Sequence, residues 1–383
     1  MRPYTWEQLA RATLGRQFPA IRGRGRDAVV ELVRRVGPIQ SQVARAPFVT
    51  VASRQPGATY ADITAVHEAY DLVRGSNLRG TVHTCAAEQH PVLDAVARRS
   101  LANLWRRSLK LERVSVEQCR AEMERFVTGR WRSRAQLRQH LTDWLASVES
   151  EASVEASRTP GVGRAMAHGH SALIRRPMTG GWDRQTPPVY RVAMDVRGVA
   201  PSPLLDDPDA AVLAITRMHL AAYGPANRRD IAWWSGAGLR DVDRALGALA
   251  DELTARDGPD GAPYYDLAET PGNGNGDPGV RLLPEYDALV VGYDPHTRDR
   301  FLDPEQLPYV WLMGNGSFSS VVLDDVRLTG SWKLTGSGPK RRVEVRMFPG
   351  QRLLAESDLA DQVASLEAAL DMQVVDVVIT TAA

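Results

Sequence analysis

Two glutamines separated by one residue, Gln40 and Gln42, have the spacing that most suggests chemistry in this sequence. In an extended segment, residues i and i+2 point to the same side, so this spacing predicts that both side-chain amides face one spot. Amide carbonyls can orient a water molecule and stabilise a nearby positive charge, although an amide is not a strong base. Two glutamines on a polar strand face are also typical of plain solvation, so the surrounding residues must decide between these interpretations.

Basic residues are concentrated in the same half of the chain. Residues 1–200 contain 31 Arg and Lys against 18 Asp and Glu, whereas residues 201–383 contain 16 against 28, so net charges of +13 and −12 combine to the overall +1. This separation of charge predicts that the N-terminal half faces a polyanion. Only three of the basic residues are lysines, which is typical of a GC-rich genome, but such a bias does not explain why the charge lies in one half.

Turns and apolar periodicity predict an α+β protein of three related winged-helix modules followed by a small C-terminal β-barrel-like domain. The third module is the clearest, with a helix over 228–234, a tight glycine turn, a second helix from Leu239 and a hairpin around 258–261. The first two modules follow this order less regularly, and a polar linker is expected at 271–277. The expected ranges of the four parts are 1–100, 101–200, 201–270 and 278–383.

Local motifs predict where several elements begin. Capping boxes, in which a hydroxyl and an amide satisfy free N–H groups at a helix start, are expected at Thr5, Ser115 and Ser133. Beyond the linker the pattern changes to short strands bounded by turns, one of them the apolar run at 288–293, and a late amphipathic helix over 357–372.

The sequence contains no pattern typical of a metal site, a disulfide framework or a membrane span. Cys85 and Cys119 are the only cysteines, and the pair His168 and His170 lacks further ligands, so we expect neither a metal nor a cofactor. The N-terminus has no apolar run of signal-peptide length, and no stretch approaches the ~20 apolar residues that a membrane span needs. These observations predict a soluble, cytoplasmic protein.

Four short motifs, in their order along the chain, resemble those of the AlkZ/YcaQ-type winged-helix DNA glycosylases. They are IQSQ at 39–42, RGTVH at 79–83, AYGPA at 222–226 and LLPEYD at 282–287, and a weaker match at 314–333 continues the series. Members of this family carry three tandem winged helices and a C-terminal β domain, so the resemblance implies the architecture expected above.

The resemblance also implies a catalytic role for the glutamine pair. In this family the Gln-x-Gln or Gln-x-Asp position is the catalytic one, which assigns catalysis to Gln40 and Gln42. Glutamine at the second position is similar to the branch associated with resistance to DNA-alkylating antibiotics. A guanine alkylated at N7 is already cationic and leaves as a neutral base, so the remaining requirement is a positioned water and dipoles facing the charge that develops on the sugar. Amide carbonyls can supply both.

The resulting prediction is a monofunctional DNA glycosylase that removes bulky N7-alkylguanine adducts and leaves an abasic site; whether crosslinks are also unhooked stays open. Its partner would be double-stranded DNA carrying alkylated guanine, bound by a nucleoid-associated monomer. The alternative is a non-enzymatic winged-helix regulator, but regulators usually dimerise and use one recognition unit, so three modules and the glutamine pair favour the enzyme. The residues expected to contact DNA are Arg22, Arg24, Arg45, Arg79, His83, Arg228, Arg229, His296 and Arg298.

Several of these residues also have a simpler interpretation. His83 could be a structural hydrogen-bonding residue on a strand, and Arg228 with Arg229 could be a solvated helix start. The arginine–glycine alternation at 22–26 resembles flexible phosphate-binding stretches and also a mobile connector. The segment 293–298 could be a hairpin tip that reaches the duplex or a plain surface turn.

Overall fold

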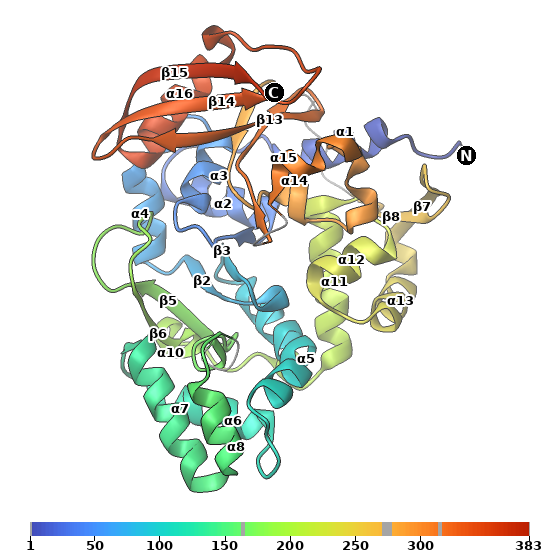
Figure 1. Ribbon diagram of the computed structural model, residues 1–383. Helices are drawn as coiled ribbons and strands as arrows, with labels where there is room; N and C mark the ends of the chain where they lie inside the picture. The colour runs from blue at the N-terminus through green and yellow to red at the C-terminus, as the bar shows by residue number, and fades with distance from the viewer. Residues whose placement is uncertain (1, 162–164, 270–277, 313–315, 383) are drawn as a thin grey trace.

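The computed structural model describes residues 2–161, 165–269, 278–312 and 316–382, so the expected linker at 271–277 lies outside the described residues. Helices and strands both contribute to every part of the fold, in agreement with the α+β prediction (Figure 1). No helix in these four ranges is long and apolar enough to cross a membrane.

The first part of the chain places the glutamine pair between helices and a sheet. The capping box predicted at Thr5 is present at the start of the first helix, where its hydroxyl accepts a hydrogen bond from the Gln8 N–H. The elements are α1 (Trp6–Gln17), α2 (Arg26–Val36), β1 (Ile39–Gln40), α3 (Ala46–Arg54), α4 (Tyr60–Glu68), β2 (Leu72–Ser76), the 3-10 helix η1 (Leu78–Gly80) and β3 (Val82–Ala86).

The second part continues the sheet of the first. Its elements are α5 (His90–Ser108), α6 (Val116–Val127), β4 (Arg132–Ser133), α7 (Arg134–Val148), α8 (Glu151–Arg158), β5 (Leu173–Pro177), β6 (Pro188–Val192) and α10 (Ala193–Arg197). The capping boxes predicted at Ser115 and Ser133 are both present.

One six-stranded sheet joins these two parts, with strand order β1-β3-β2-β5-β6-β4. The junction is the antiparallel pairing of Gly75 with Ile174. Gly75 fits because a Cβ there would lie 2.8 Å from the Leu173 carbonyl oxygen. The expected boundary between residues 100 and 101 falls inside α5, which runs through both parts.

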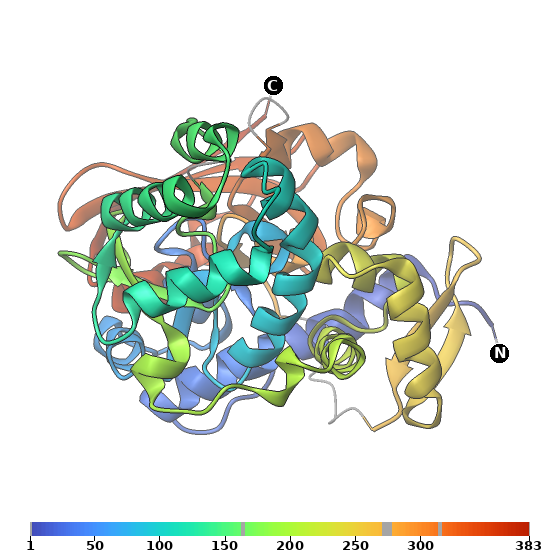
Figure 2. The same ribbon diagram turned by 90° about the horizontal axis from the view of Figure 1, so that it is seen from below.

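The third part contains the predicted helix, turn, helix and hairpin. Asn227 caps the first of these helices in a capping box, and Gly236 ends it with φ 76°, the left-handed conformation that glycine adopts without strain. The hairpin lies beside the N-terminus, where the Tyr4 N–H donates to the Asp257 carbonyl over 2.8 Å (Figure 2). The elements are η2 (Pro203–Leu205), α11 (Pro208–Tyr223), α12 (Arg228–Ser235), α13 (Leu239–Ala248), η3 (Ala250–Glu252), β7 (Leu253–Asp257) and β8 (Pro263–Leu267).

The C-terminal part forms a second sheet, with order β15-β14-β13-β12-β9. Among the described strands β15 and β9 are edges, so the pairing is that of an open sheet rather than a closed barrel. The run at 288–293, expected as a strand, instead begins with a short helix. The elements are β9 (Arg281–Leu283), α14 (Ala288–Val291), η4 (Pro295–Arg300), η5 (Pro304–Gln306), α15 (Leu307–Val310), β10 (Trp311–Leu312), β11 (Ser317–Phe318), β12 (Val321–Asp324), β13 (Arg327–Thr335), β14 (Lys340–Met347), α16 (Glu356–Leu370) and β15 (Gln373–Thr381).

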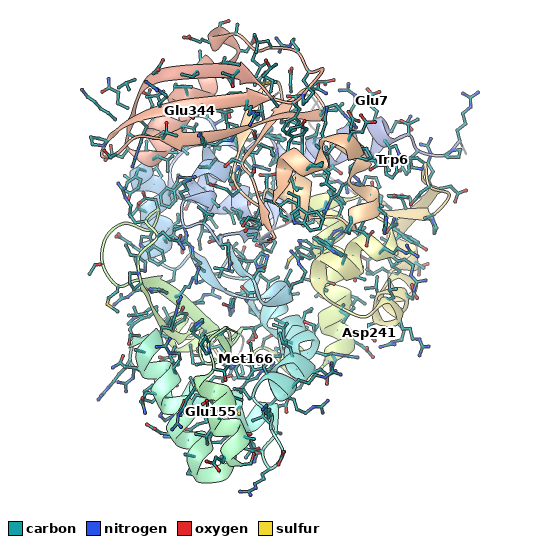
Figure 3. All side chains as sticks on the ribbon, viewed as in Figure 1. Trp6, Glu7, Glu155, Met166, Asp241 and Glu344 are labelled. Carbon is teal, nitrogen blue, oxygen red and sulfur yellow. The ribbon has the colours of Figure 1, made fainter. Side chains whose placement is uncertain are left out.

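Buried side chains connect the parts across their boundaries. One apolar cluster combines residues of α2 and α3 with residues of β13, β14 and α16, so the C-terminal sheet packs directly on the first part. A separate cluster fills the second part, where Met166 is 7% exposed (Figure 3). The fully buried ion pair between Arg300 and Asp230, at 3.4 Å, joins the third part to the C-terminal part.

Candidate active site

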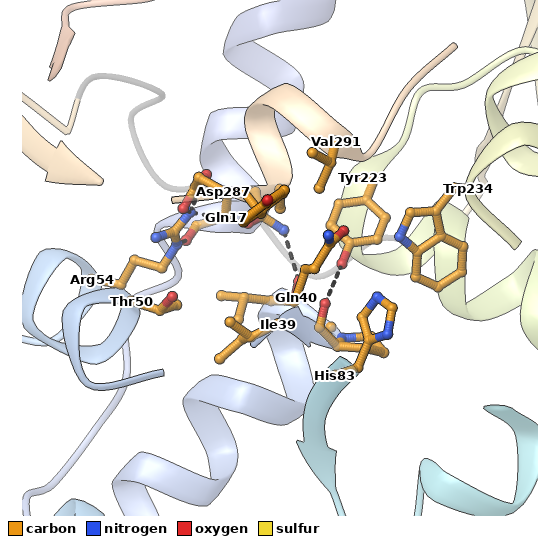
Figure 4. Close-up of a pocket in the computed structure, with 15 residues that line it drawn as sticks. Gln17, Ile39, Gln40, Thr50, Arg54, His83, Tyr223, Trp234, Asp287 and Val291 are labelled. Atoms are coloured by element: carbon orange, nitrogen blue, oxygen red, sulfur yellow. Dashed lines mark hydrogen bonds and ion pairs between the residues drawn. The ribbon is translucent and has the colours of Figure 1, made fainter. Parts of the chain in front are cut away.

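Gln40 is the last residue of β1 and pairs with His83 of β3 in antiparallel register. Its side chain is buried, and its Oε1 accepts a hydrogen bond from Arg79 Nη2 over 3.3 Å. Gln40 lines a cavity of about 20 Å³, which is enough space for roughly one water molecule. Figure 4 shows Arg54 and Asp287 on one side of Gln40, and Tyr223, Trp234 and His83 on the other.

Gln42 lies beyond the end of β1 and is exposed to solvent. Its Oε1 accepts a hydrogen bond from the Val82 N–H over 3.0 Å, and it does not line the cavity. Strand β1 ends at Gln40, and Gln40 but not Gln42 lines the cavity, so the two amides do not meet there. Both glutamines nevertheless bind the same segment, since Gln40 contacts Arg79 and Gln42 contacts Val82. The two motifs at 39–42 and 79–83 are therefore in direct contact.

Arg79 connects this site to the third part of the chain. Its Nη1 donates to the Trp234 carbonyl oxygen, and its guanidinium lies 4.6 Å from the centroid of the Trp233 ring. Burial lowers the pKa of Arg79 to about 10, which leaves the side chain charged at neutral pH. A positive charge thus lies against the amide oxygen of Gln40 and fixes its orientation.

His83 is buried beside Gln40 and lines the same cavity. Its Nδ1 lies 3.2 Å from the Thr81 carbonyl oxygen. Burial and, second, the charge of Arg79 lower the pKa of His83 to about 3, so its imidazole is neutral at physiological pH. His83 can contribute a hydrogen bond or a surface to the cavity, but it is not a proton donor in the neutral range.

A carboxylate that sequence reasoning missed, Asp287, forms the opposite wall of the cavity. Both of its oxygens accept hydrogen bonds from Arg54 Nη2, over 3.0 and 2.9 Å, and the two side chains are 2% and 1% exposed. Its Oδ1 also accepts from the Leu289 N–H. The only signal in the sequence was that Asp287 ends the LLPEYD motif at 282–287; nothing indicated Arg54 as its partner.

Of the other residues expected to contact DNA, five are exposed, and Arg45 is partly buried. Arg45 forms an ion pair with Glu285 at 2.5 Å, and Arg228 forms one with Asp243 at 2.6 Å, so both are already paired with carboxylates. The exposed residues are Arg22, Arg24, Arg229 and His296, in addition to the paired Arg228.

Residues 293–298 do not form the hairpin tip that was one of their two interpretations. Residues 295–300 form the 3-10 helix η4, because Asp294 accepts a hydrogen bond from the His296 N–H and Pro295 favours the first helical position. Arg298 is buried and lies 5.0 Å from the centroid of the Trp233 ring, on which Arg79 also stacks. Burial lowers the pKa of Arg298 to about 10. In this structure the buried Arg298 stacks on Trp233, and its contact with DNA stays a prediction.

The burial of His83 predicts a pH effect on stability. The pKa of His83 is about 3 in the folded protein and about 6.5 in an unfolded chain, so only the unfolded state takes up its proton between these values. The free energy of unfolding should therefore fall as the pH drops below about 6.5, by ~1.4 kcal/mol per pH unit from this residue. Urea unfolding at about pH 6 and about pH 4 measures how the free energy of unfolding changes with pH. For His83→Gln this change should be smaller than for the unmodified protein by the uptake of one proton. The exposed His296→Gln is the control, and equal slopes for both variants would contradict the assignment.

Comparisons with known proteins cover most of the chain, including the residues of this site. A family model described as DNA glycosylase AlkZ-like matches residues 33–371, which includes both glutamines, Arg79, His83 and Asp287. The chain belongs to the AlkZ-like family of DNA glycosylases. The family predicted from the four short motifs is therefore confirmed, as is the prediction of a DNA glycosylase enzyme, and the alternative of a non-enzymatic regulator is not favoured.

A curated protein and a solved structure, both from Streptomyces sahachiroi, are similar to the chain. A protein named interstrand DNA cross-link repair glycosylase is 25% identical over 341 residues, which cover 86% of this chain and 88% of that protein. The solved structure of Streptomyces sahachiroi DNA glycosylase AlkZ matches with a TM-score of 0.79 and 21% identity, over 98% of this chain and 99% of that one. The likeness to the solved structure shows that the fold is shared along almost the whole chain.

Proposed function

We propose that this glycosylase hydrolyses the N-glycosidic bond of bulky N7-alkylguanine in duplex DNA, with Gln40 and Gln42 at the reacting bond. The observation that carries the proposal is the position of Gln40, whose amide is held by Arg79 at a cavity with space for about one water molecule. The solvent-exposed Gln42 contacts the same segment from outside the cavity. A nucleotide placed beside the cavity would have the buried amide of Gln40 next to the water in the cavity. The exposed amide of Gln42 would lie on the side of the DNA.

The proposed reaction requires little acid–base chemistry from the protein. The bond between C1′ and N9 breaks, and its electron pair neutralises the positive charge of the N7-alkylated ring. The water oxygen forms a bond to C1′ and releases one proton to the solvent. The amide oxygen of Gln40 would orient this water, and the amide dipoles would stabilise the developing positive charge on the sugar.

The similar protein that is named for interstrand crosslink repair supports a bulky substrate. We therefore include crosslinked N7-alkylguanines in the proposed substrate class, and we expect a role in base-excision repair or in self-resistance to a DNA-alkylating metabolite. Since the substrate would be chromosomal DNA, we expect the protein to act in the cytoplasm. We also expect it to be a monomer.

The architecture that we propose for DNA binding is three winged helices. Its best support is the third part of the chain, where α12, α13 and the β7–β8 hairpin follow one another in the order of a winged helix. In this proposal residues 1–100 and 101–200 form the other two units and 278–383 the C-terminal β domain. The first two units would be fused by their common sheet.

The proposed function is tested with a duplex that carries one N7-alkylguanine. Incubation with the protein followed by alkali should cleave the strand at that guanine, because alkali breaks the chain at abasic sites. The same duplex without protein, and an undamaged duplex with protein, are the controls. Binding of the damaged duplex without any alkali-labile site would favour a protein that recognises damage and does not hydrolyse it.

The charge of the N-terminal half predicts a steep salt dependence of DNA binding. Residues 1–200 carry a net charge of +13, and a protein that contacts about six phosphates loses roughly 1000-fold in affinity between ~50 and ~200 mM salt. Titration of an undamaged duplex at several salt concentrations measures this slope. An affinity that stays constant over this range would contradict a phosphate-binding surface on this half.

A further inference from the structure

An arginine-lined cavity of about 230 Å³ lies beside the residues that follow Gln42. It is formed by the facing ends of β5 and β6, by the loop that joins them, and by Ala44. This loop runs alongside α4, where the Tyr60 hydroxyl donates to Asp183 over 2.9 Å (Figure 1). No acidic residue belongs to its lining in the described parts of the chain. The basic residues of the lining are Arg74, Arg134, Arg175, Arg176 and Arg184.

Arg74 is a buried cation with no carboxylate within ion-pair distance in the described ranges, although the charge of Asp183 acts on it from farther away. It is 6% exposed, and its guanidinium donates to three neutral oxygens: Thr84 Oγ1, and the carbonyls of Trp182 and Ala44. Burial and, second, the charge of Arg175 lower the pKa of Arg74 to about 9, so it remains charged at neutral pH. A buried charge is costly unless it is paired, and an anion in the cavity would supply the missing charge.

The other arginines add to this positive potential. Of the five lining arginines, only Arg184 has a carboxylate within ion-pair distance in the described structure; this is Asp183, at 3.2 Å. Arg176 is held 4.4 Å from the centroid of the Trp131 ring. The Oγ1 of Thr186, which also lines the cavity, is buried without a hydrogen-bond partner in the described residues. The cavity therefore combines fixed cationic groups with an unused hydroxyl, which suits a tetrahedral oxyanion.

One side chain connects this cavity to the glutamine pair. Gln185 accepts a hydrogen bond from the Ala44 N–H over 3.0 Å and donates to the Gln42 carbonyl oxygen over 3.4 Å. The wall behind it is rigid, because Trp182 stacks on the His67 ring at 4.8 Å. An anion bound in the cavity would thus lie at a fixed position relative to Gln42.

We propose that this cavity binds one backbone phosphate of the DNA strand that carries the damaged base, next to the nucleotide being hydrolysed. This rests on the proposed function for the identity of the nucleotide, but phosphate binding itself does not depend on hydrolysis. Bound there, the phosphate fixes the position of the strand so that the sugar of the damaged nucleotide stands at Gln40 and Gln42. The arginines act as positioning residues in this proposal.

The test compares two variants that each remove two exposed arginines. Arg134→Gln/Arg176→Gln changes the cavity, and Arg107→Gln/Arg352→Gln removes the same charge elsewhere. For an undamaged duplex, the cavity variant should bind about tenfold more weakly or worse. Its slope of log affinity against log salt should decrease by about 0.9 for the one phosphate lost. The control should change less than twofold, and equal effects of the two variants would overturn the proposal.

Two further measurements identify the source and the place of the phosphate. A methylphosphonate linkage replaces one charged phosphate of the DNA by a neutral group. When such linkages are placed one at a time around an N7-alkylguanine, one position should weaken binding of the unmodified protein but not binding of the cavity variant. If no position shows this coupling, the cavity does not hold a phosphate next to the lesion. Inorganic phosphate is the second probe. If the unmodified protein binds it and the cavity variant does not, while both bind DNA equally well, the site is one for free phosphate and the proposal is wrong. If one methylphosphonate position shows this coupling but the damaged base is not hydrolysed, the proposed function is refuted and the phosphate site is not.

Discussion

Replacement of Gln40 or Gln42 by alanine is expected to slow excision by about 10- to 1000-fold, the range observed when one preorganised dipole is removed from an active site. The reasons differ for the two residues. Gln40→Ala removes the amide that Arg79 holds at the cavity. Gln42→Ala removes the exposed amide that binds the Val82 N–H. Single-turnover rates on a duplex with one N7-alkylguanine measure both effects.

Two controls separate this effect from damage to the fold. The exposed Gln139→Ala on α7 removes an amide far along the sequence from the motif, and its rate should equal that of the unmodified protein. Thermal unfolding and DNA affinity of the Gln42→Ala variant should be nearly unchanged because the side chain is exposed. Full single-turnover rates in both single variants and in the double variant would show that the motif is structural.

Excision is also expected to require a cationic base. His83 lines the cavity with a pKa of about 3, so it is not a proton donor for a neutral leaving base near pH 7. Both oxygens of Asp287, on the opposite wall, accept hydrogen bonds from Arg54. We expect turnover of N7-alkylguanine and little or none of uracil, hypoxanthine or N6-modified adenine in the same duplex. Gln42→Asp should keep or broaden the activity.

Single-turnover rates on duplexes that differ only in the damaged base provide the measurement. Neither Asp62 nor Glu88, two acidic residues of the first part of the chain, lines the cavity. Comparable rates on uracil and on N7-alkylguanine would refute the leaving-group argument even for an active glycosylase.

The sequence predicted those features that depend on local chemistry. The capping boxes at Thr5, Ser115 and Ser133, and the helices and hairpin of the third part, are all present, because each depends on residues a few positions apart. The run at 288–293 was misassigned because a short apolar run does not distinguish a strand from a buried helix. There the side chain of Asp287 accepts from the Leu289 N–H and starts α14 instead.

The features that the sequence could not predict depend on residues far apart in the chain. Arg54 and Asp287 are separated by 233 positions, yet they form the buried ion pair of the cavity. The single contact between Gly75 and Ile174 that fuses the sheets of the first two parts has no local signature either. The glutamine pair was found through its motif, but its geometry was not, because the position of Gln40 depends on the pairing of β1 with the distant strand β3.

The contacts of Arg79 have a consequence for how the protein can search DNA. This one side chain holds Gln40 and, at the same time, the backbone of Trp234 and the ring of Trp233 on α12. A motion that moves α12 away from η1 must break the contacts of Arg79 with Trp233 and Trp234, which leaves Gln40 as the contact that this side chain can keep. A protein that opened in this way during its search of DNA would hold the Gln40 amide less firmly than the closed protein does.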